Sequence, residues 1–362
     1  MKNKILYILP SEEIGGTEKM VAILAKGISK FRFQPVVLTL QKRGSFHKML
    51  DADYIRNYFL DVKRRPLQAI GKLLFIILKE KPCIMHSFLF TGNMFAKCLR
   101  IFCWIPLVCS QRSTDDWKRA VHWKLEKFTN FLCSIIISNS KAGKRVLIEK
   151  TGVTPLRIKV IPNGIDLEQI REKLKLVKSF YHTEIIIGSI GNLRKAKGYD
   201  VLIEAAEIIC KKRKDIRFEI LGKGPLETHI RAKIHKLNLG EFVKLYGFTE
   251  DVYNYIINFD IVVIPSIWEG FPVVALEAMA CGKPIIATNV GDLPEIVENG
   301  TTGIIVEPGK PKALAAAILT LISNKDMRQM MGNNALRRVE EFSSDTMVSQ
   351  YGKIYDLLLL RQ

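Results

Sequence analysis

The chain has 362 residues, of which 48% are hydrophobic, enough for two domains of ordinary size with their own cores. Lysine and arginine outnumber aspartate and glutamate by 55 to 36, so the formal net charge is +19. No apolar run reaches about 18 residues, which argues against a transmembrane helix. The seven scattered cysteines contain no CxxC pair, which argues against zinc and disulfides and fits a reducing cytosol.

Short apolar runs alternate with helical segments through the first half of the chain. The first run, residues 4–9, ends in Pro-Ser-Glu-Glu rather than at a small-residue cleavage site, so it predicts a strand and not a secretory leader. A helical segment follows over residues 17–28. Further strand-like runs lie at residues 35–40, 83–88, 106–110, 134–139 and 157–162.

A glycine pair, Gly15 and Gly16, lies between the first strand and the first helix. Glycines at such a junction let the backbone N–H groups of the helix N-terminus approach an anion closely. A tight turn without a ligand is the alternative. The dinucleotide fingerprint G-x-G-x-x-G is absent here.

The positive charge is concentrated in the first half. Residues 1–166 hold 29 Lys and Arg against 12 Asp and Glu, whereas residues 167–362 hold 26 against 24. Residues 63–81 and 116–128 mix basic residues with Leu, Phe and Trp, which suits an anionic membrane surface. A solvated basic face is the plain alternative, and nucleic acid ranks lower because no nucleic-acid-binding signature is present.

The alternation restarts after the Pro-Asn-Gly turn within residues 162–169. Strand-like runs lie at residues 184–191, 216–222, 242–247, 261–265, 284–289 and 302–308, with helices between them at 199–212, 226–236 and from Pro272. Two rounds of βα alternation predict an α/β protein with two doubly wound domains. We place them at residues 1–166 and 167–345, followed by a final helix in 346–362.

The loop after the first strand of the second round carries Asn192, Arg194 and Lys197. Two cations at the carboxyl end of a strand suit a pyrophosphate, because arginine grips oxygens in pairs and lysine acts as a point charge. Basic loops are more often merely solvated. The signal gains weight because this loop should lie on the same sheet edge as Glu269.

The segment of residues 266–284, SIWEGFPVVALEAMACGKP, holds two carboxylates in apolar surroundings. Pro272 suits the first position of a helix that Gly282 ends. Glu277 is the only charge of that helix, so it needs a polar partner. That partner is either a nearby backbone group or lysine of the protein, or a hydroxyl of a ligand bound at the open C-terminal edge of the sheet.

These motifs together resemble the retaining family 4 glycosyltransferases of the two-Rossmann-domain (GT-B) class. The resemblance covers almost the whole chain and is strongest from Pro162 to Pro308. It implies an N-terminal acceptor domain and a C-terminal nucleotide-sugar domain facing a cleft. It also implies a last helix, about Thr346 to Leu360, that crosses back to the first domain.

The resemblance also implies roles for single residues. Glu269 would contact the hydroxyls of the transferred sugar, helped by backbone N–H groups from Gly270 to Val273, a stretch that includes Phe271 and Pro272. Glu277 would bind the ribose, and Arg194, Lys197 and the helix N-terminus would hold the diphosphate without a metal ion. His86 matches the cleft histidine of the family, with a satisfied core histidine as the alternative. The family pattern has arginine where this chain has Asn192, so the arginine role passes to Arg194.

The function expected from this resemblance is transfer of a hexose to a glycan in capsule, O-antigen or similar polysaccharide synthesis. The co-substrate would be a UDP- or GDP-linked sugar, with no cofactor, and the acceptor would be lipid-linked. The protein would be cytoplasmic and peripheral to the inner face of the plasma membrane. A nucleotide-sugar epimerase and a non-enzymatic basic membrane-binding protein are the competing readings; the second leaves Glu277 unexplained.

Overall fold

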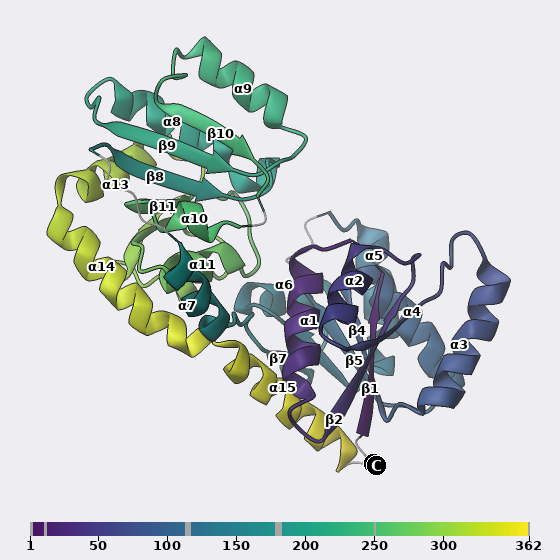
Figure 1. The fold of residues 1–362 in the computed structure, drawn as a ribbon. Helices are drawn as coiled ribbons and strands as arrows, with labels where there is room; N and C mark the ends of the chain where they lie inside the picture. The colour runs from purple at the N-terminus through teal and green to yellow at the C-terminus, as the bar shows by residue number, and fades with distance from the viewer. Residues whose placement is uncertain (1–2, 11–12, 113–116, 178–182, 250, 361–362) are drawn as a thin grey trace. The chain divides into compact units, whose positions relative to one another are not determined.

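The structure is a computed structural model that describes residues 3–10, 13–112, 117–177, 183–249 and 251–360. The chain divides into two compact units: Met1–Gly164 with Ser344–Gln362, and Ile165–Ser343. Each unit is built on one parallel β-sheet with helices packed against it (Figure 1). The predicted α/β class with two doubly wound domains is therefore confirmed.

The first unit holds a seven-stranded parallel sheet in the order β3-β2-β1-β4-β5-β6-β7 within the described residues. Its strands are β1 (Asn3–Leu9), β2 (Phe33–Thr39), β3 (Arg56–Phe59), β4 (Ile84–Phe88), β5 (Leu107–Gln111), β6 (Ile135–Ser138) and β7 (Ile158–Val160). Its helices are α1 (Gly16–Ile28), α2 (Ser45–Ala52), α3 (Pro66–Glu80), α4 (Leu89–Phe102), α5 (Ala120–Thr129), α6 (Lys141–Thr151) and α15 (Ser344–Leu359). Two short 3₁₀ helices cover Asn130–Leu132 and Pro155–Arg157.

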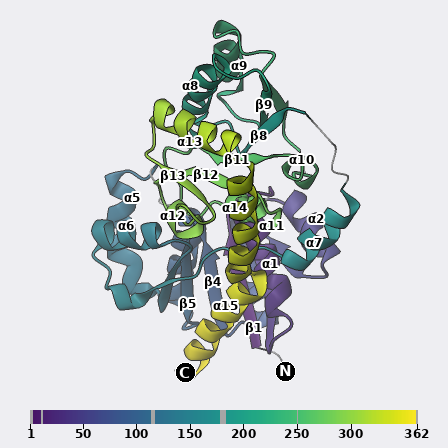
Figure 2. The same ribbon diagram turned by 90° about the vertical axis from the view of Figure 1, so that its left-hand side faces the viewer.

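The strands of the first unit send alternate side chains to opposite faces of the sheet. Leu6 and Ile8 of β1 join a core that contains residues of α3, α4 and α6. Tyr7 points to the other face, where its hydroxyl lies 3.3 Å from that of Tyr355 on α15. Helix α15 packs along α1 on this face (Figure 2). The last described helix thus belongs to the first unit, although it follows the second unit in the chain.

The second unit holds a six-stranded parallel sheet in the order β10-β9-β8-β11-β12-β13 within the described residues. Its strands are β8 (Ile185–Ile190), β9 (Ile216–Leu221), β10 (Val243–Gly247), β11 (Ile261–Ile264), β12 (Ile285–Thr288) and β13 (Gly303–Val306). Its longer helices are α7 (Leu167–Leu176), α8 (Tyr199–Cys210), α9 (Glu227–Lys236), α11 (Val273–Ala280), α13 (Pro311–Ser323) and α14 (Lys325–Arg338). Its short helices are α10 (Tyr253–Ile256), α12 (Leu293–Ile296) and the 3₁₀ turns η3 (Lys195–Lys197) and η4 (Val339–Phe342).

Two buried clusters flank this second sheet. Ile187 and Phe218 face the cluster that contains α8, α9 and α13. Ile186 and Val262 face the cluster that contains α7, α10, α11 and α12. The near-continuous apolar runs of β8 and β11 follow from this double cover, because both faces of these strands are buried.

Candidate active site

The carboxyl ends of β8 and β11 meet where the strand order of the second sheet reverses. Ligands of doubly wound sheets bind outside the strand ends at such a point. The loops after these strands touch, because the N–H of Ile267 donates a hydrogen bond to the carbonyl oxygen of Ala196 at 2.7 Å. At Gly198, where φ is +66°, any Cβ would overlap the carbonyl oxygen of Pro265. The two loops that carry the predicted phosphate and sugar ligands are therefore in contact.

Lys197 and Glu269 face each other across this contact. The Nζ of Lys197 forms an ion pair with Oε1 of Glu269, and the same oxygen accepts a hydrogen bond from the Ser266 hydroxyl at 2.9 Å. The two charged side chains are 26% and 11% exposed. The pair is thus partly withdrawn from water, which strengthens its attraction, and still within reach of a ligand.

Tyr199 lies next to this pair. Its hydroxyl donates to the carbonyl oxygen of Gly191 at 3.1 Å. Burial raises the pKa of Tyr199; a hydrogen bond with Ser189 lowers it, and the negative charge of Glu269 raises it again. The phenol is held above its ordinary pKa, so it remains a hydrogen-bond donor at neutral pH.

The loop after β12 holds the backbone at Glu269 and Gly270 in place. The N–H of Asp292 donates to the carbonyl oxygen of Gly270 at 3.0 Å. Gly291 has a φ of +58°, and a Cβ there would overlap the carbonyl oxygen of Glu269. A side chain at residue 291 would therefore displace the loop that carries the acidic residue.

Helix α11 begins directly after the loop that carries Glu269, at Val273. Pro272 precedes the first helical residue with an extended backbone, so its predicted place inside the first turn is wrong by one position. Phe271 is buried, and its ring lies 5.7 Å from that of Phe342. The N–H groups of Val273 and Val274 open α11 without a preceding helical turn to accept from them, as at any helix N-terminus, whereas that of Ala275 donates to the carbonyl oxygen of Pro272 at 3.2 Å.

Arg194 and Asn192 are exposed in the loop after β8. Among the described residues, the guanidinium of Arg194 has no recorded hydrogen bond or ion pair. The loop itself is held by its neighbour after β9, because a Cβ at Gly222 would overlap the carbonyl oxygen of Gly191 and one at Gly224 would crowd that of Leu193. Arg194 is thus an exposed cation on a loop whose backbone is held by its neighbour.

Glu277 is half-buried on α11. Tyr253 is nearby: burial raises its pKa, and the charge of Glu277 raises it further. Burial likewise raises the pKa of Cys281 to about 12; Lys283 lowers it and Glu277 adds to the rise. Glu277 therefore lies close enough to both side chains to raise their pKa values, and the predicted ribose contact stays a prediction.

Gly15 and Gly16 open α1 in the first unit. Gly15 is the N-cap, and its N–H donates to Oε2 of Glu18 at 3.1 Å. A Cβ at Gly15 would crowd that carboxylate, whereas one at Gly16 would meet nothing within 4 Å. An internal carboxylate therefore occupies one of the N–H groups that we expected to bind an external anion.

His86 lies on β4 and is 0% exposed. Its Nδ1 is 2.7 Å from the Tyr355 hydroxyl and its Nε2 is 2.7 Å from that of Ser110. Burial, aided by the positive charge of Arg112, holds the pKa of His86 well below its usual value. With both ring nitrogens engaged, the described structure matches the satisfied core histidine rather than the cleft histidine.

Several contributors to this site were missed from the sequence. They are the partners of the acidic loop and of the basic loop, namely Ser266, Tyr199, Gly222, Gly224, Gly291 and Asp292. The GKG of residues 222–224 and the VGD of residues 290–292 each follow a strand closely, which is the signal that could have revealed them.

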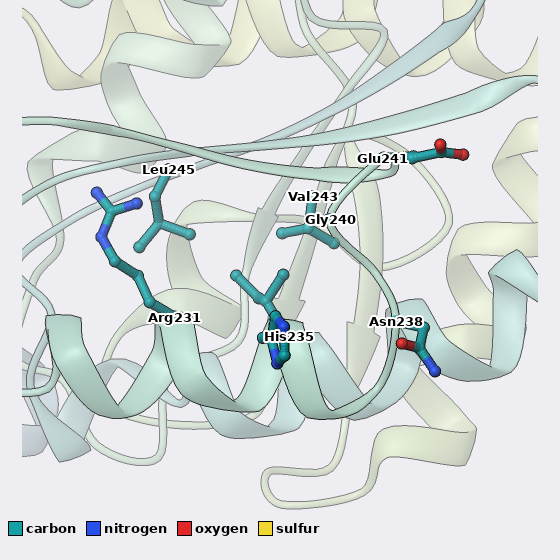
Figure 3. A pocket seen from close by; sticks show the side chains of 8 residues that line it. Arg231, His235, Asn238, Gly240, Glu241, Val243 and Leu245 are labelled. Atoms are coloured by element: carbon teal, nitrogen blue, oxygen red, sulfur yellow. The ribbon is translucent and has the colours of Figure 1, made fainter.

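A separate cleft of about 610 Å³ lies between α9 and β10 (Figure 3). Arg231, His235 and Glu241 are among its lining residues. None of the predicted site residues lines it.

Over the described residues, no group of three or more His, Cys, Asp or Glu could hold a metal ion. In the same part of the chain, every helix is too short or too polar to cross a bilayer.

Two protein-family models match this chain in succession. "Glycosyltransferase Family 4" matches residues 14–169 and "Glycosyl transferases group 1" matches residues 170–338. The second model therefore contains every residue of the Lys197–Glu269 site.

Curated relatives extend over most of the chain. The capsular polysaccharide biosynthesis glycosyltransferase CapM of Staphylococcus aureus is 28% identical over 309 residues, which is 81% of each chain. A Campylobacter jejuni protein is 26% identical over 347 residues, 91% of this chain and 92% of its own. Its name is N-acetylgalactosamine-N,N'-diacetylbacillosaminyl-diphospho-undecaprenol 4-alpha-N-acetylgalactosaminyltransferase.

Solved structures share the fold. Anabaena Alr3699/HepE, crystallised with UDP, superposes with a TM-score of 0.84 at 22% identity and covers 98% of this chain and 99% of its own. A glycosyltransferase from Rickettsia africae has the same TM-score at 23% identity, with 99% of both chains covered.

Proposed function

Because this chain belongs to the glycosyltransferase family that the group 1 and family 4 models describe, we propose that it transfers a hexose from a nucleoside diphosphate sugar to a lipid-linked glycan. We further propose that the sugar keeps its anomeric configuration. The names of relatives support this acceptor: the Campylobacter jejuni protein and an Escherichia coli galactosyltransferase, 26% identical over 348 residues, are both named for diphospho-undecaprenol substrates.

The observation that carries the proposal is the Lys197–Glu269 pair beside the start of α11. A bound diphosphate would meet the ammonium of Lys197, the unengaged guanidinium of Arg194 and the first N–H groups of α11. These groups stabilise the negative charge that develops as the sugar leaves. Glu269 would then turn from its lysine to the sugar hydroxyls, and Glu277 would accept from the ribose.

In this proposal the negative charge of the leaving diphosphate is stabilised by cations and a helix dipole of the chain itself. No metal ion is required by it. We expect transfer to continue after a chelator has removed divalent cations from the reaction, and dependence on added metal would contradict this part of the proposal.

The acceptor would be met at an anionic membrane surface, on the inner face of the plasma membrane. Support comes from the balance of +17 in residues 1–166 against +2 in the rest of the chain. Such a charge attracts the protein to anionic lipid and loses strength as salt rises.

A screen of UDP- and GDP-linked sugars tests the proposal. We expect release of nucleoside diphosphate with one of them, only when membrane extract supplies the acceptor, and a product whose NMR spectrum shows the retained configuration. Conversion of the sugar nucleotide into its epimer without acceptor would favour the epimerase instead.

The same assay assigns the arginine role. Arg194→Ala should lower kcat/KM by at least about tenfold, about 1.4 kcal/mol of transition-state stabilisation, with the fold intact. Asn192→Ala is the matched neighbour. A silent Arg194→Ala together with a damaging Asn192→Ala would reverse the assignment.

A further inference from the structure

Helix α3 is apolar on two opposite faces. Ala69, Leu73 and Ile76 are buried in the core of the first unit. The opposite face carries five large side chains that are more than half exposed: Leu67 (84%), Ile70 (58%), Leu74 (55%), Phe75 (57%) and Leu78 (72%). At about 100° per residue these five fall within an arc of about 140°. A helix that is apolar all round usually has both faces covered.

The exposed charges on α3 and its flanks are all positive. They belong to Lys63, Arg64, Arg65, Lys79 and Lys81. The one acidic residue of the helix, Glu80, is buried and forms ion pairs with Lys4 and Arg56, each at 2.9 Å. The solvent-facing side of this segment therefore combines an apolar stripe with unopposed cations.

The basic side chains of α3 also lie along aromatic rings. The Nζ of Lys79 is 5.4 Å from the centre of the Phe75 ring, and that of Lys72 is 3.7 Å from the centre of the Phe59 ring. Each ammonium group is thus attracted to the face of an aromatic ring, which keeps a cation beside apolar surface. This arrangement suits the boundary between acyl chains and headgroups.

We propose that the exposed face of α3 is the membrane-binding element of this protein, with its five apolar side chains inserted between lipids and its cations on anionic headgroups. The inference deepens the proposed function, on whose membrane-bound acceptor it rests. A basic amphipathic helix lying in the interface has this composition. A second copy of the chain fits the same face poorly, because its cations would meet cations.

Vesicle flotation of the full chain tests this assignment. The probes are vesicles of phosphatidylcholine alone and of phosphatidylcholine mixed with phosphatidylglycerol. We expect Leu74→Gln/Leu78→Gln to weaken binding to the mixed vesicles by at least about tenfold, since two inserted side chains become polar. The matched control is Leu156→Gln/Leu176→Gln, which changes two leucines that are 87% and 86% exposed elsewhere, and it should bind like the parent.

A second variant separates charge from insertion. Arg64→Gln/Arg65→Gln should reduce the preference for phosphatidylglycerol and flatten the loss of binding with salt. Undiminished binding by the leucine variant would overturn the proposal. So would a parent protein that is dimeric in size-exclusion chromatography and becomes monomeric in that variant, because a second copy would then cover the face.

Failure here can be told apart from failure of the proposed function. Thermal stabilisation by UDP or GDP is measured on the same proteins without vesicles. If nucleotide still stabilises the proteins but the leucine variant and its control bind vesicles equally well, only the α3 assignment is wrong. Loss of nucleotide stabilisation in the parent protein would remove the proposed function instead.

Discussion

Lys197 and Glu269 form an ion pair, so replacing either side chain should affect both nucleotide-sugar binding and the stability of the fold. Lys197→Ala leaves a carboxylate that is 11% exposed with the Ser266 hydroxyl but without its cation. We expect the free energy of unfolding to fall by about 1 to 3 kcal/mol and transfer to fall at least about tenfold. Urea unfolding and nucleotide release measure the two effects, with exposed Lys195→Ala as the control. Equal behaviour of the two variants would contradict the role of Lys197.

A substitution of Glu277 can test whether its partner is a ligand or a side chain of the protein itself. If the ribose is its partner, Glu277→Gln should melt near the parent temperature, while the stabilisation by UDP or GDP shrinks. If an internal cation is its partner, removal of the charge typically costs about 3 to 5 kcal/mol with or without nucleotide. Thermal unfolding of both proteins decides, and an early-melting variant with the full nucleotide shift would contradict the ribose contact.

His86 should make the protein less stable in mild acid. Its pKa lies well below 6.5 in the folded protein, so below that pH the unfolded chain takes up a proton that the folded one refuses. Stability is therefore complete above about pH 6.5 and falls by up to about 1.4 kcal/mol per pH unit below it. Urea unfolding at about pH 7.5 and about pH 5.5 should show a smaller drop for His86→Gln than for the parent or for exposed His235→Gln. Identical drops would mean that His86 can be protonated in place.

At the scale of elements, the contact between two loops is as important as the residues they carry. Gly198→Ala forces a side chain into a left-handed backbone position, worth about 1 to 2 kcal/mol, and against the carbonyl oxygen of Pro265. We expect lower stability and loss of nucleotide stabilisation in thermal unfolding. Gly240→Ala is the control, since a Cβ there meets nothing within 4 Å. Normal nucleotide binding by Gly198→Ala would show that the loops need not touch.

The sheets could be predicted from the sequence because their strands are buried apolar runs. The edge strand β3 could not, since its RNYF has no apolar run and is only partly buried. The charged residues of the site followed from their position after strands. Their small partners, such as Ser266 and Gly291, did not, because their importance comes from contacts between loops that are distant in the chain. The partners of His86 could not be foreseen for the same reason: α15 covers it from more than 260 residues away.

At the scale of the whole molecule, the cover that α15 provides should be needed by one unit only. Tyr355 is fully buried and hydrogen-bonded to His86, so Tyr355→Ala should destabilise the first unit by about 3 to 5 kcal/mol. Leu357→Ala, on the same helix at 37% exposure, is the control. We expect urea unfolding of this variant to split into two transitions. The first unit should unfold at a lower urea concentration, and the transition that nucleotide shifts to higher urea, which belongs to the second unit, should stay where it is in the parent. A single early transition that nucleotide no longer shifts would mean that the second unit depends on α15 as well.

The place of α15 after the second unit also imposes an order on synthesis. The ribosome makes residues 1–164 first, then all of residues 165–343, and only afterwards the helix that covers Tyr7 and His86. At about 5 to 20 residues per second this interval is on the order of ten seconds or more. Throughout it the part of the first sheet around Tyr7 and His86 lacks the helix that later buries it, while the second unit, continuous in the chain, can already fold. The growing polypeptide therefore exposes, for a time, surface that the finished protein buries, and exposed surface of this kind favours aggregation.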